Sequence, residues 1–250
     1  NLEDLPVEES RKKDKRGVLG IIYGMLFDKW LRAAKALSKP TDGIISRYVN
    51  RKLSAPISLF IVEHNIPITP NHMTLISFLC ALASMMSFVL DMPFLGGVLA
   101  QVTSVLDGVD GEIARLRNMK SSFGAYLDSV LDRFADCGIV VSFVLFLLRH
   151  LRGLYMEVSI LGMVAVFGMI IHSYVHNIFK AHFNISPADV VKHPSLASRD
   201  VRLFLIFIGC ILGFYFETLI ALALISTIGS TIRFIELLSK AKSLGTGSSC

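Results

Sequence analysis

Apolar and polar residues form long blocks along this 250-residue chain, and the blocks change character near residue 70. From Gly17 to Leu37, hydrophobic residues such as Leu19, Ile22 and Leu26 recur at helical spacing, while lysines and arginines occupy another face. The apolar part of this segment is too short to span a bilayer. The pattern predicts a basic amphipathic helix that lies on a membrane surface.

A second helix is predicted from about residue 44 to residue 63, with basic residues at its start and a more apolar end. The segment Lys39 to Gly43, KPTDG, interrupts the chain before it. We therefore expect residues 1–42 to form a charged linker and a juxtamembrane amphipathic helix. Residues 43–250 are expected to form a membrane domain that begins with this interfacial helix.

The region after residue 70 consists of apolar runs long enough for membrane-spanning helices, which need about 20 residues. The expected spans are about 72–91, 93–118, 122–149, 154–181, 200–214 and 216–240. Six crossings place both chain ends on the same side of the membrane. The fold class predicted is an all-α integral membrane protein, with six transmembrane helices preceded by interfacial amphipathic helices.

Composition and charge extend this picture. Hydrophobic residues make up 53% of the chain, and 12 of the 25 lysines and arginines precede residue 70. Most of the others fall on the same predicted side, which is expected to be cytoplasmic because cytoplasmic loops are rich in Lys and Arg; only Arg149 and Arg152 fall opposite. No basic soluble module indicates nucleic-acid binding. The four cysteines are scattered singly, which indicates neither a disulfide framework nor a cysteine metal site.

Four aspartates stand out against these apolar surroundings. Asp107 and Asp110 are three residues apart near the end of one predicted helix, and Asp128 and Asp132 are four apart near the start of the next. Both spacings put a pair on one helix face, so two pairs can face each other. A charged side chain within a bilayer costs roughly 2.5–3.5 kcal/mol. Divalent cations offset this cost, and hard oxygen ligands suit Mg²⁺ or Mn²⁺.

Small and basic residues accompany the acids. Gly108, Gly111 and Ala114 leave room for close helix contact or for a bulky ligand, and Arg115 is suited to a forked hydrogen bond with phosphate. Carboxylates, small residues and an arginine together favour metal-assisted phosphoryl chemistry, in which two metal ions clamp the transferring phosphate. Two alternatives remain open: structural ion pairs, and the intramembrane ion site of a divalent-ion transporter.

Other polar residues near these helices are interpreted differently. Asp136 follows Asp132 by four residues and is interpreted as a supporting or helix-packing acid. Glu112 points away from the aspartate face and is expected to be a solvated partner of a basic residue. His172 and His176 lack a third ligand, and we interpret them as hydrogen-bonded core residues rather than a metal site.

The segment from Asp107 to Asp132 resembles the signature of the CDP-alcohol phosphotransferases, D-x2-D-G-x2-A-R-x8-G-x3-D-x3-D, at every fixed position and every gap. The segment Thr69 to Thr74, TPNHMT, is similar to that family's TPN-x2-T entry to its first span. The resemblance implies a six-helix membrane enzyme, usually a homodimer. Such enzymes transfer the phosphoalcohol group of a CDP-alcohol to an acceptor hydroxyl and release CMP.

The resemblance also implies roles for individual residues. Metal ligands, for two Mg²⁺ or Mn²⁺ ions, are Asp107, Asp110, Asp128 and Asp132. Asp132 is also the expected general base. The nucleotide-binding residues are Asn71, Thr74, Asp110, Gly111, Ala114 and Arg115.

One branch of the family is similar over a further segment, Lys39 to Ser54. Its members are di-myo-inositol phosphate phosphate synthases fused behind an inositol-1-phosphate cytidylyltransferase domain, so an upstream domain of that kind is expected. They use CDP-inositol and inositol 1-phosphate, and the phosphorylated acceptor requires a second basic pocket. The candidates are Lys180, His182, Lys192, Arg199 and Arg202. The aspartate motif does not exclude the other branch, phospholipid synthases that use CDP-diacylglycerol or CDP-archaeol.

Overall fold

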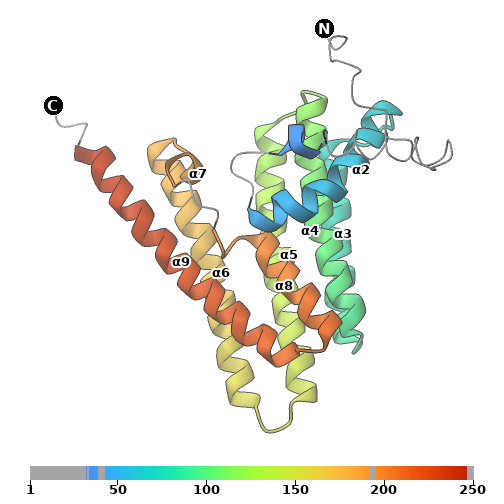
Figure 1. Ribbon diagram of the computed structural model, residues 1–250, viewed down its shortest axis with the longest axis vertical. Helices are drawn as coiled ribbons and strands as arrows, with labels where there is room; N and C mark the ends of the chain where they lie inside the picture. The colour runs from blue at the N-terminus through green and yellow to red at the C-terminus, as the bar shows by residue number, and fades with distance from the viewer. Residues whose placement is uncertain (1–31, 33, 39–42, 192–194, 247–250) are drawn as a thin grey trace, which may run out of the picture.

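A computed structural model describes residues 32, 34–38, 43–191 and 195–246, and these residues are helical or in short connections without a β-strand (Figure 1). The all-α expectation is therefore confirmed for the described part of the chain. Most of the amphipathic helix expected at residues 17–37 lies outside the described residues, as does Lys192.

The helices follow the apolar pattern of the sequence closely. In chain order they are η1 (Ser46–Asn50), α2 (Arg51–Glu63), α3 (Pro70–Val89), α4 (Pro93–Leu116), α5 (Ser122–His150), α6 (Tyr155–Phe183), α7 (Pro187–Val190), α8 (Arg199–Leu212) and α9 (Tyr215–Thr246). Within the described residues, α3, α6 and α9 are long and apolar enough to cross a membrane. The described part of the chain therefore has three candidate spans by length and composition, and the six expected crossings stay a prediction.

The helices form two groups, which are joined through α8 and through the packing of α5 on α6. Helices α3, α4 and α5 pack together, α6 packs along α9, and α8 packs on α4 and on α9 (Figure 1). Small residues allow two of these close contacts: a Cβ on Gly97 would lie 2.5 Å from the Cβ of Cys210, and one on Gly168 would lie 2.7 Å from the backbone of Ser226. Neither glycine can therefore take a side chain unless a helix shifts.

The starts of α3 and α5 are fixed by local sequence. Thr69 and His72 form a capping box, in which the Thr69 hydroxyl accepts from the His72 amide and the Thr69 amide donates to the His72 ring. Pro70 occupies the first helical turn, where a missing N–H costs nothing. The Ser121 hydroxyl caps α5 by accepting from the Gly124 amide at 3.0 Å. These caps bring the beginnings of α3 and α5 to the aspartate end of α4.

Helix α2 is bonded to α4 by buried polar groups. The Glu112 carboxylate accepts hydrogen bonds from Arg51 at 2.6 Å, Ser54 at 2.7 Å and Ser58 at 2.5 Å. Glu112 is fully buried, so the expectation of a solvated side chain is wrong, although its basic partner exists. Burying this carboxylate is tolerated because charge and hydrogen bonds surround it.

A second arginine fixes the other end of α2. The Arg117 guanidinium donates to the carbonyl oxygens of Ile61, Ile66 and Ile68 at 2.7–3.0 Å, where the chain turns from α2 towards α3. These carbonyls lie at or beyond the end of α2, where no further helical turn follows, and the guanidinium supplies donors to them. Helix α2 is thus attached to α4 at both of its ends.

Candidate metal and nucleotide site

Three of the predicted ligands meet where α4 and α5 face each other. Carboxylate oxygens of Asp107, Asp110 and Asp128 all lie within 4.8 Å of one another. The Thr74 hydroxyl, from the first turns of α3, donates to the Asp110 carboxylate at 2.6 Å and fixes its orientation. The helical spacing in the sequence therefore brings together these three acids.

The chemistry of these residues fits a divalent cation. Oxygen donors of this kind suit Mg²⁺ or Mn²⁺. The Oδ1 atom of Asp128 is buried and has no hydrogen-bond partner among the described residues. A buried carboxylate oxygen without a donor is costly, and coordination of a cation is one way to satisfy it.

Asp132 lies beside the three acids but is bound by an arginine. The Arg199 guanidinium, at the start of α8, lies 2.7 Å from Asp132 and 2.6 Å from Asp107. It also donates to Asp136 at 2.7 Å. Asp132 is thus held in the same network, and its roles as ligand and general base stay predictions.

Asp136 has a packing role in this structure. It is buried and pairs with both Arg199 and Arg202, the latter at 2.8 Å. Arg202 also donates to the carbonyl oxygen of Ala197. Two of the arginines proposed for an acceptor phosphate are thus engaged with acids here, because α8 enters the bundle at the level of the aspartates.

The remaining acceptor candidates lie at the end of α6. Lys180 and His182 are exposed on its last turn, and the His182 Nδ1 lies 3.0 Å from the carbonyl oxygen of Ile178. Their helix also carries the two histidines His172 and His176, whose ring centroids are 4.8 Å apart. These two candidates are exposed, whereas the arginines on α8 are largely buried.

The two histidines lie on α6, which packs along α9, the helix that carries the buried Arg233. The His172 Nδ1 and His176 Nε2 atoms are buried without a hydrogen-bond partner among the described residues, so our interpretation of them as hydrogen-bonded does not hold at these atoms. Two arginines, Arg202 on α8 and Arg233 on α9, are also buried. The available signal was Arg233 itself, a cation within the apolar run of the last helix.

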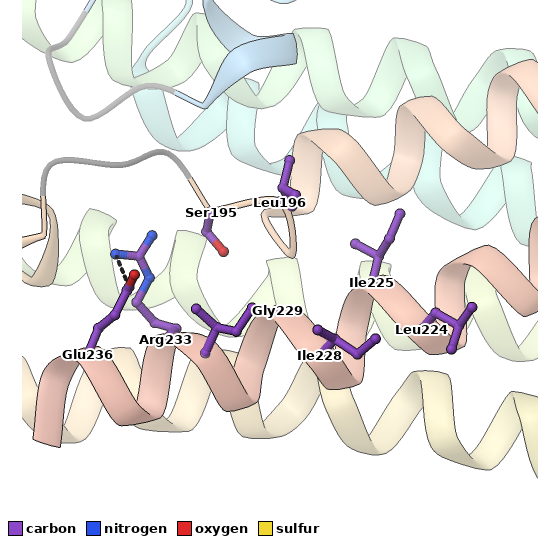
Figure 2. Close-up of a pocket in the computed structure, with 9 residues that line it drawn as sticks. Ser195, Leu196, Leu224, Ile225, Ile228, Gly229, Arg233 and Glu236 are labelled. Atoms are coloured by element: carbon purple, nitrogen blue, oxygen red, sulfur yellow. Dashed lines mark ion pairs between the residues drawn. The ribbon is translucent and has the colours of Figure 1, made fainter.

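Arg233 also lies at one end of a groove beside α9. The groove is mainly apolar, has a volume of about 290 Å³ and runs between α9 and the segment that begins at Ser195. Figure 2 shows isoleucines 225 and 228 along it and the ion pair of Arg233 with Glu236 at one end, 3.5 Å long. The groove is thus apolar along most of its length and has Arg233 at one end.

A cavity of about 240 Å³ adjoins the acids on the side of α3. Its lining includes the predicted nucleotide residues Asn71, Thr74, Asp110, Gly111 and Ala114. A Cβ on Gly124 would lie 2.9 Å from the Asn71 side-chain oxygen, so glycine is needed there for Asn71 to keep this position. We call this space the α3 pocket.

Arg115 lines a second cavity, of about 320 Å³, between the start of α8 and residues 43–51. Its guanidinium donates to the Leu37 carbonyl oxygen at 3.3 Å. The two cavities share Asp110, Gly111 and Asp128. The structure therefore divides the predicted nucleotide residues between two pockets that meet at the acids.

The family model for CDP-alcohol phosphatidyltransferase matches residues 67–230. A bifunctional IPC transferase and DIPP synthase of Aquifex aeolicus is 37% identical over 189 residues, which cover 75% of this chain and 42% of that protein. The protein of the same name in Archaeoglobus fulgidus is 41% identical over 174 residues, which cover 69% of this chain and 33% of that protein. The chain thus spans well under half the length of these curated relatives.

A solved structure shares the fold. The phosphatidylinositol phosphate synthase of Mycobacterium tuberculosis, with CDP-DAG bound, superposes with a TM-score of 0.62 at 19% sequence identity, over 74% of this chain and 94% of that chain. The residues matched by the family model contain the three converging acids, Asp132 and both pockets' shared residues. This chain belongs to the CDP-alcohol phosphatidyltransferase family.

Proposed function

We propose that this chain transfers the phosphoalcohol group of a CDP-alcohol to an acceptor hydroxyl and releases CMP. The observation that carries the proposal is the convergence of Asp107, Asp110 and Asp128 at the junction of two pockets, one of which contains Asn71 and Thr74. Family membership supports the same reaction. A transport site would need the acids but not this nucleotide-sized space beside them.

The reaction is a substitution at phosphorus. The acceptor oxygen attacks the phosphorus that carries the donor's alcohol, the bond to the bridging oxygen breaks, and CMP leaves with that oxygen. Asp107, Asp110 and Asp128 would hold the Mg²⁺ or Mn²⁺ ions, proposed to be two, that neutralise the diphosphate. Asp132 is the proposed base that takes the acceptor's proton. Arg199, already bonded to Asp132, orients it and adds positive charge.

For the substrates we propose CDP-inositol and inositol 1-phosphate, which give di-myo-inositol phosphate phosphate. The support is the similarity of residues 39–54 to that branch and the two relatives named as DIPP synthases. An upstream cytidylyltransferase domain belongs to the same proposal. The second candidate, phospholipid synthesis from CDP-diacylglycerol or CDP-archaeol, is supported by the likeness in fold to a structure with CDP-DAG bound.

The acceptor's phosphate is assigned to the buried basic group on α6, α8 and α9. Arg202, Arg233 and His172 are all buried, α9 with Arg233 packs along α6, and Arg202 is bonded to Asp136, the neighbour of the reacting acids. A phosphate there would satisfy the imidazole atoms that lack partners. Lys180 and His182 are the candidates for guiding the acceptor in from the end of α6.

The membrane arrangement is part of the proposal. Six crossings, cytoplasmic termini, a cytoplasmic active site and a homodimer are supported by the charge pattern and by the family resemblance. Single cysteines at Lys120 and Arg152, in an otherwise cysteine-free chain, are expected to react with an impermeant thiol reagent from opposite sides of sealed vesicles. Equal reaction from one side contradicts this topology.

Turnover tests the proposed reaction. Purified protein is supplied with Mg²⁺ or Mn²⁺, inositol 1-phosphate and either CDP-inositol or CDP-diacylglycerol, and CMP release is measured. Acceptor-dependent CMP from CDP-inositol supports the first substrate pair, whereas turnover only with the lipid donor supports the second. Metal uptake into protein-containing vesicles, without CMP from any donor, would establish the transporter alternative instead.

A further inference from the structure

The second cavity, which we call the α8 pocket, begins where the α3 pocket ends. The shared residues Asp110, Gly111 and Asp128 form the boundary between them. A donor whose diphosphate lies at these acids therefore extends in two directions. If its cytidine occupies the α3 pocket beside Asn71, its alcohol enters the α8 pocket, because the diphosphate joins the two groups.

The α8 pocket is polar. Its exposed lining is more polar than apolar, in contrast to the α3 pocket. Side chains from three elements supply hydroxyl, amide and carboxylate groups to it. They are Ser46, Asn50, Ser104, Ser198 and Asp200.

Much of this lining is already fixed by hydrogen bonds. The Asn50 amide donates to Ser104 at 2.9 Å, and the Ser46 amide donates to the Asp200 carboxylate at 2.7 Å. The Ser198 Oγ is different, because it is buried and has no hydrogen-bond partner among the described residues. A ligand hydroxyl is the kind of group that completes such a site.

From this lining we infer that the α8 pocket receives the donor's alcohol, and that Ser104 and Ser198 select a compact polyol over a lipid. The inference rests on the proposed transfer reaction and adds its donor specificity. At about 320 Å³ the pocket has the size of a small-molecule site. A cyclic polyol offers hydroxyls to the Ser198 Oγ and to the partly exposed Asp200 carboxylate, whereas an acyl chain would leave the Ser198 Oγ without a partner and would desolvate Asp200.

The test compares donor binding with CMP binding. Dissociation constants of CDP-inositol and CMP are measured for the purified protein with Mn²⁺, without acceptor, for the wild type, Ser198→Ala and Ser104→Leu. Ser198→Ala is expected to weaken CDP-inositol by about tenfold, the effect of one unsatisfied hydrogen bond, and to leave CMP within about twofold. Ser104→Leu is expected to abolish CDP-inositol binding and retain CMP binding, which also reports that the variant is folded.

Ser142→Ala is the matched control, because this hydroxyl donates within α5 to the Ile139 carbonyl oxygen and lines neither pocket. Equal weakening of CDP-inositol and CMP, or an unchanged CDP-inositol constant in both variants, overturns the assignment of the α8 pocket. Failure of the transfer reaction has another signature: CMP is not released although CDP-inositol still binds the wild type more tightly than Ser198→Ala.

Discussion

The Arg51 guanidinium and the Glu112 carboxylate lie 2.6 Å apart in a buried ion pair that joins α2 to α4. The same guanidinium donates to the carbonyl oxygen of Gly108 at 3.3 Å, next to Asp107. Helix α2 is therefore in direct contact with the backbone beside Asp107, a proposed metal ligand. This contact makes the pair a support for the site as well as for the fold.

Removing one partner of this pair is expected to destabilise the protein by about 3–5 kcal/mol, since it leaves a buried charge without compensation. Glu112→Ala and Arg51→Ala should each show this loss in denaturant unfolding followed in detergent. The double variant Arg51→Met, Glu112→Leu should lose much less than the sum of the two single losses. Additive losses would show that the two charges do not depend on each other.

The proposed metal site predicts that one substitution lowers both metal binding and turnover. Asp110→Asn removes a carboxylate that Thr74 orients, and CMP release should fall by about 10²–10³-fold with a matching loss of Mn²⁺ affinity. Asp91→Asn is the control, because Asp91 is exposed and pairs with Arg149 at the far end of α3. Retained Mn²⁺ affinity in Asp110→Asn would contradict the metal assignment.

Asp132 is expected to behave differently if it is the base. Asp132→Asn should lower kcat by about 10²–10⁴-fold, the usual contribution of general base catalysis. Its Mn²⁺ affinity should change by less than about threefold, because Arg199 rather than the three-acid group holds this side chain. A parallel loss of kcat and Mn²⁺ affinity would make Asp132 a ligand instead.

Gly111 offers a substitution that separates stability from binding. A Cβ there would meet only the Arg115 side chain, at 3.4 Å, so Gly111→Ala is expected to stabilise the helix by roughly 0.5–1 kcal/mol. The added methyl lies where both pockets meet, and the KM for the donor should rise about tenfold or more. Ser142→Ala on α5, which lines neither pocket, is the control for the KM. An unchanged KM in Gly111→Ala would show that the donor does not approach this helix closely.

The sequence predicted much of the fold because burial in a helix leaves a periodic trace. The apolar runs located six long helices, and the spacing of Asp107, Asp110 and Asp128 brought three acids to one place. Periodicity also placed Glu112 on another face of α4. It does not say what covers that face, and so the burial of Glu112 by α2 was missed.

The rest of the site depends on contacts between distant segments. Arg199 follows Asp132 by 67 residues, and only the packing of α8 on α4 brings its guanidinium between the two helices that carry the acids. The division of the nucleotide residues between two pockets likewise depends on where residues 43–51 dock. No local spacing in the sequence encodes either arrangement.

The partition of the helices into apolar and charged ones has a consequence for biosynthesis. Within the described residues, α3 and α9 are candidates for independent entry into lipid, whereas α4 carries the acids and α8 has 14 residues. Helix α4 follows α3 along the chain, so α3, on which α4 packs, is synthesised first. Helix α8 precedes α9 and is joined to it by a short turn, so α8 is synthesised immediately before α9. A nascent chain therefore has Asp107 and Asp132 long before it has Arg199, the residue whose guanidinium binds both carboxylates.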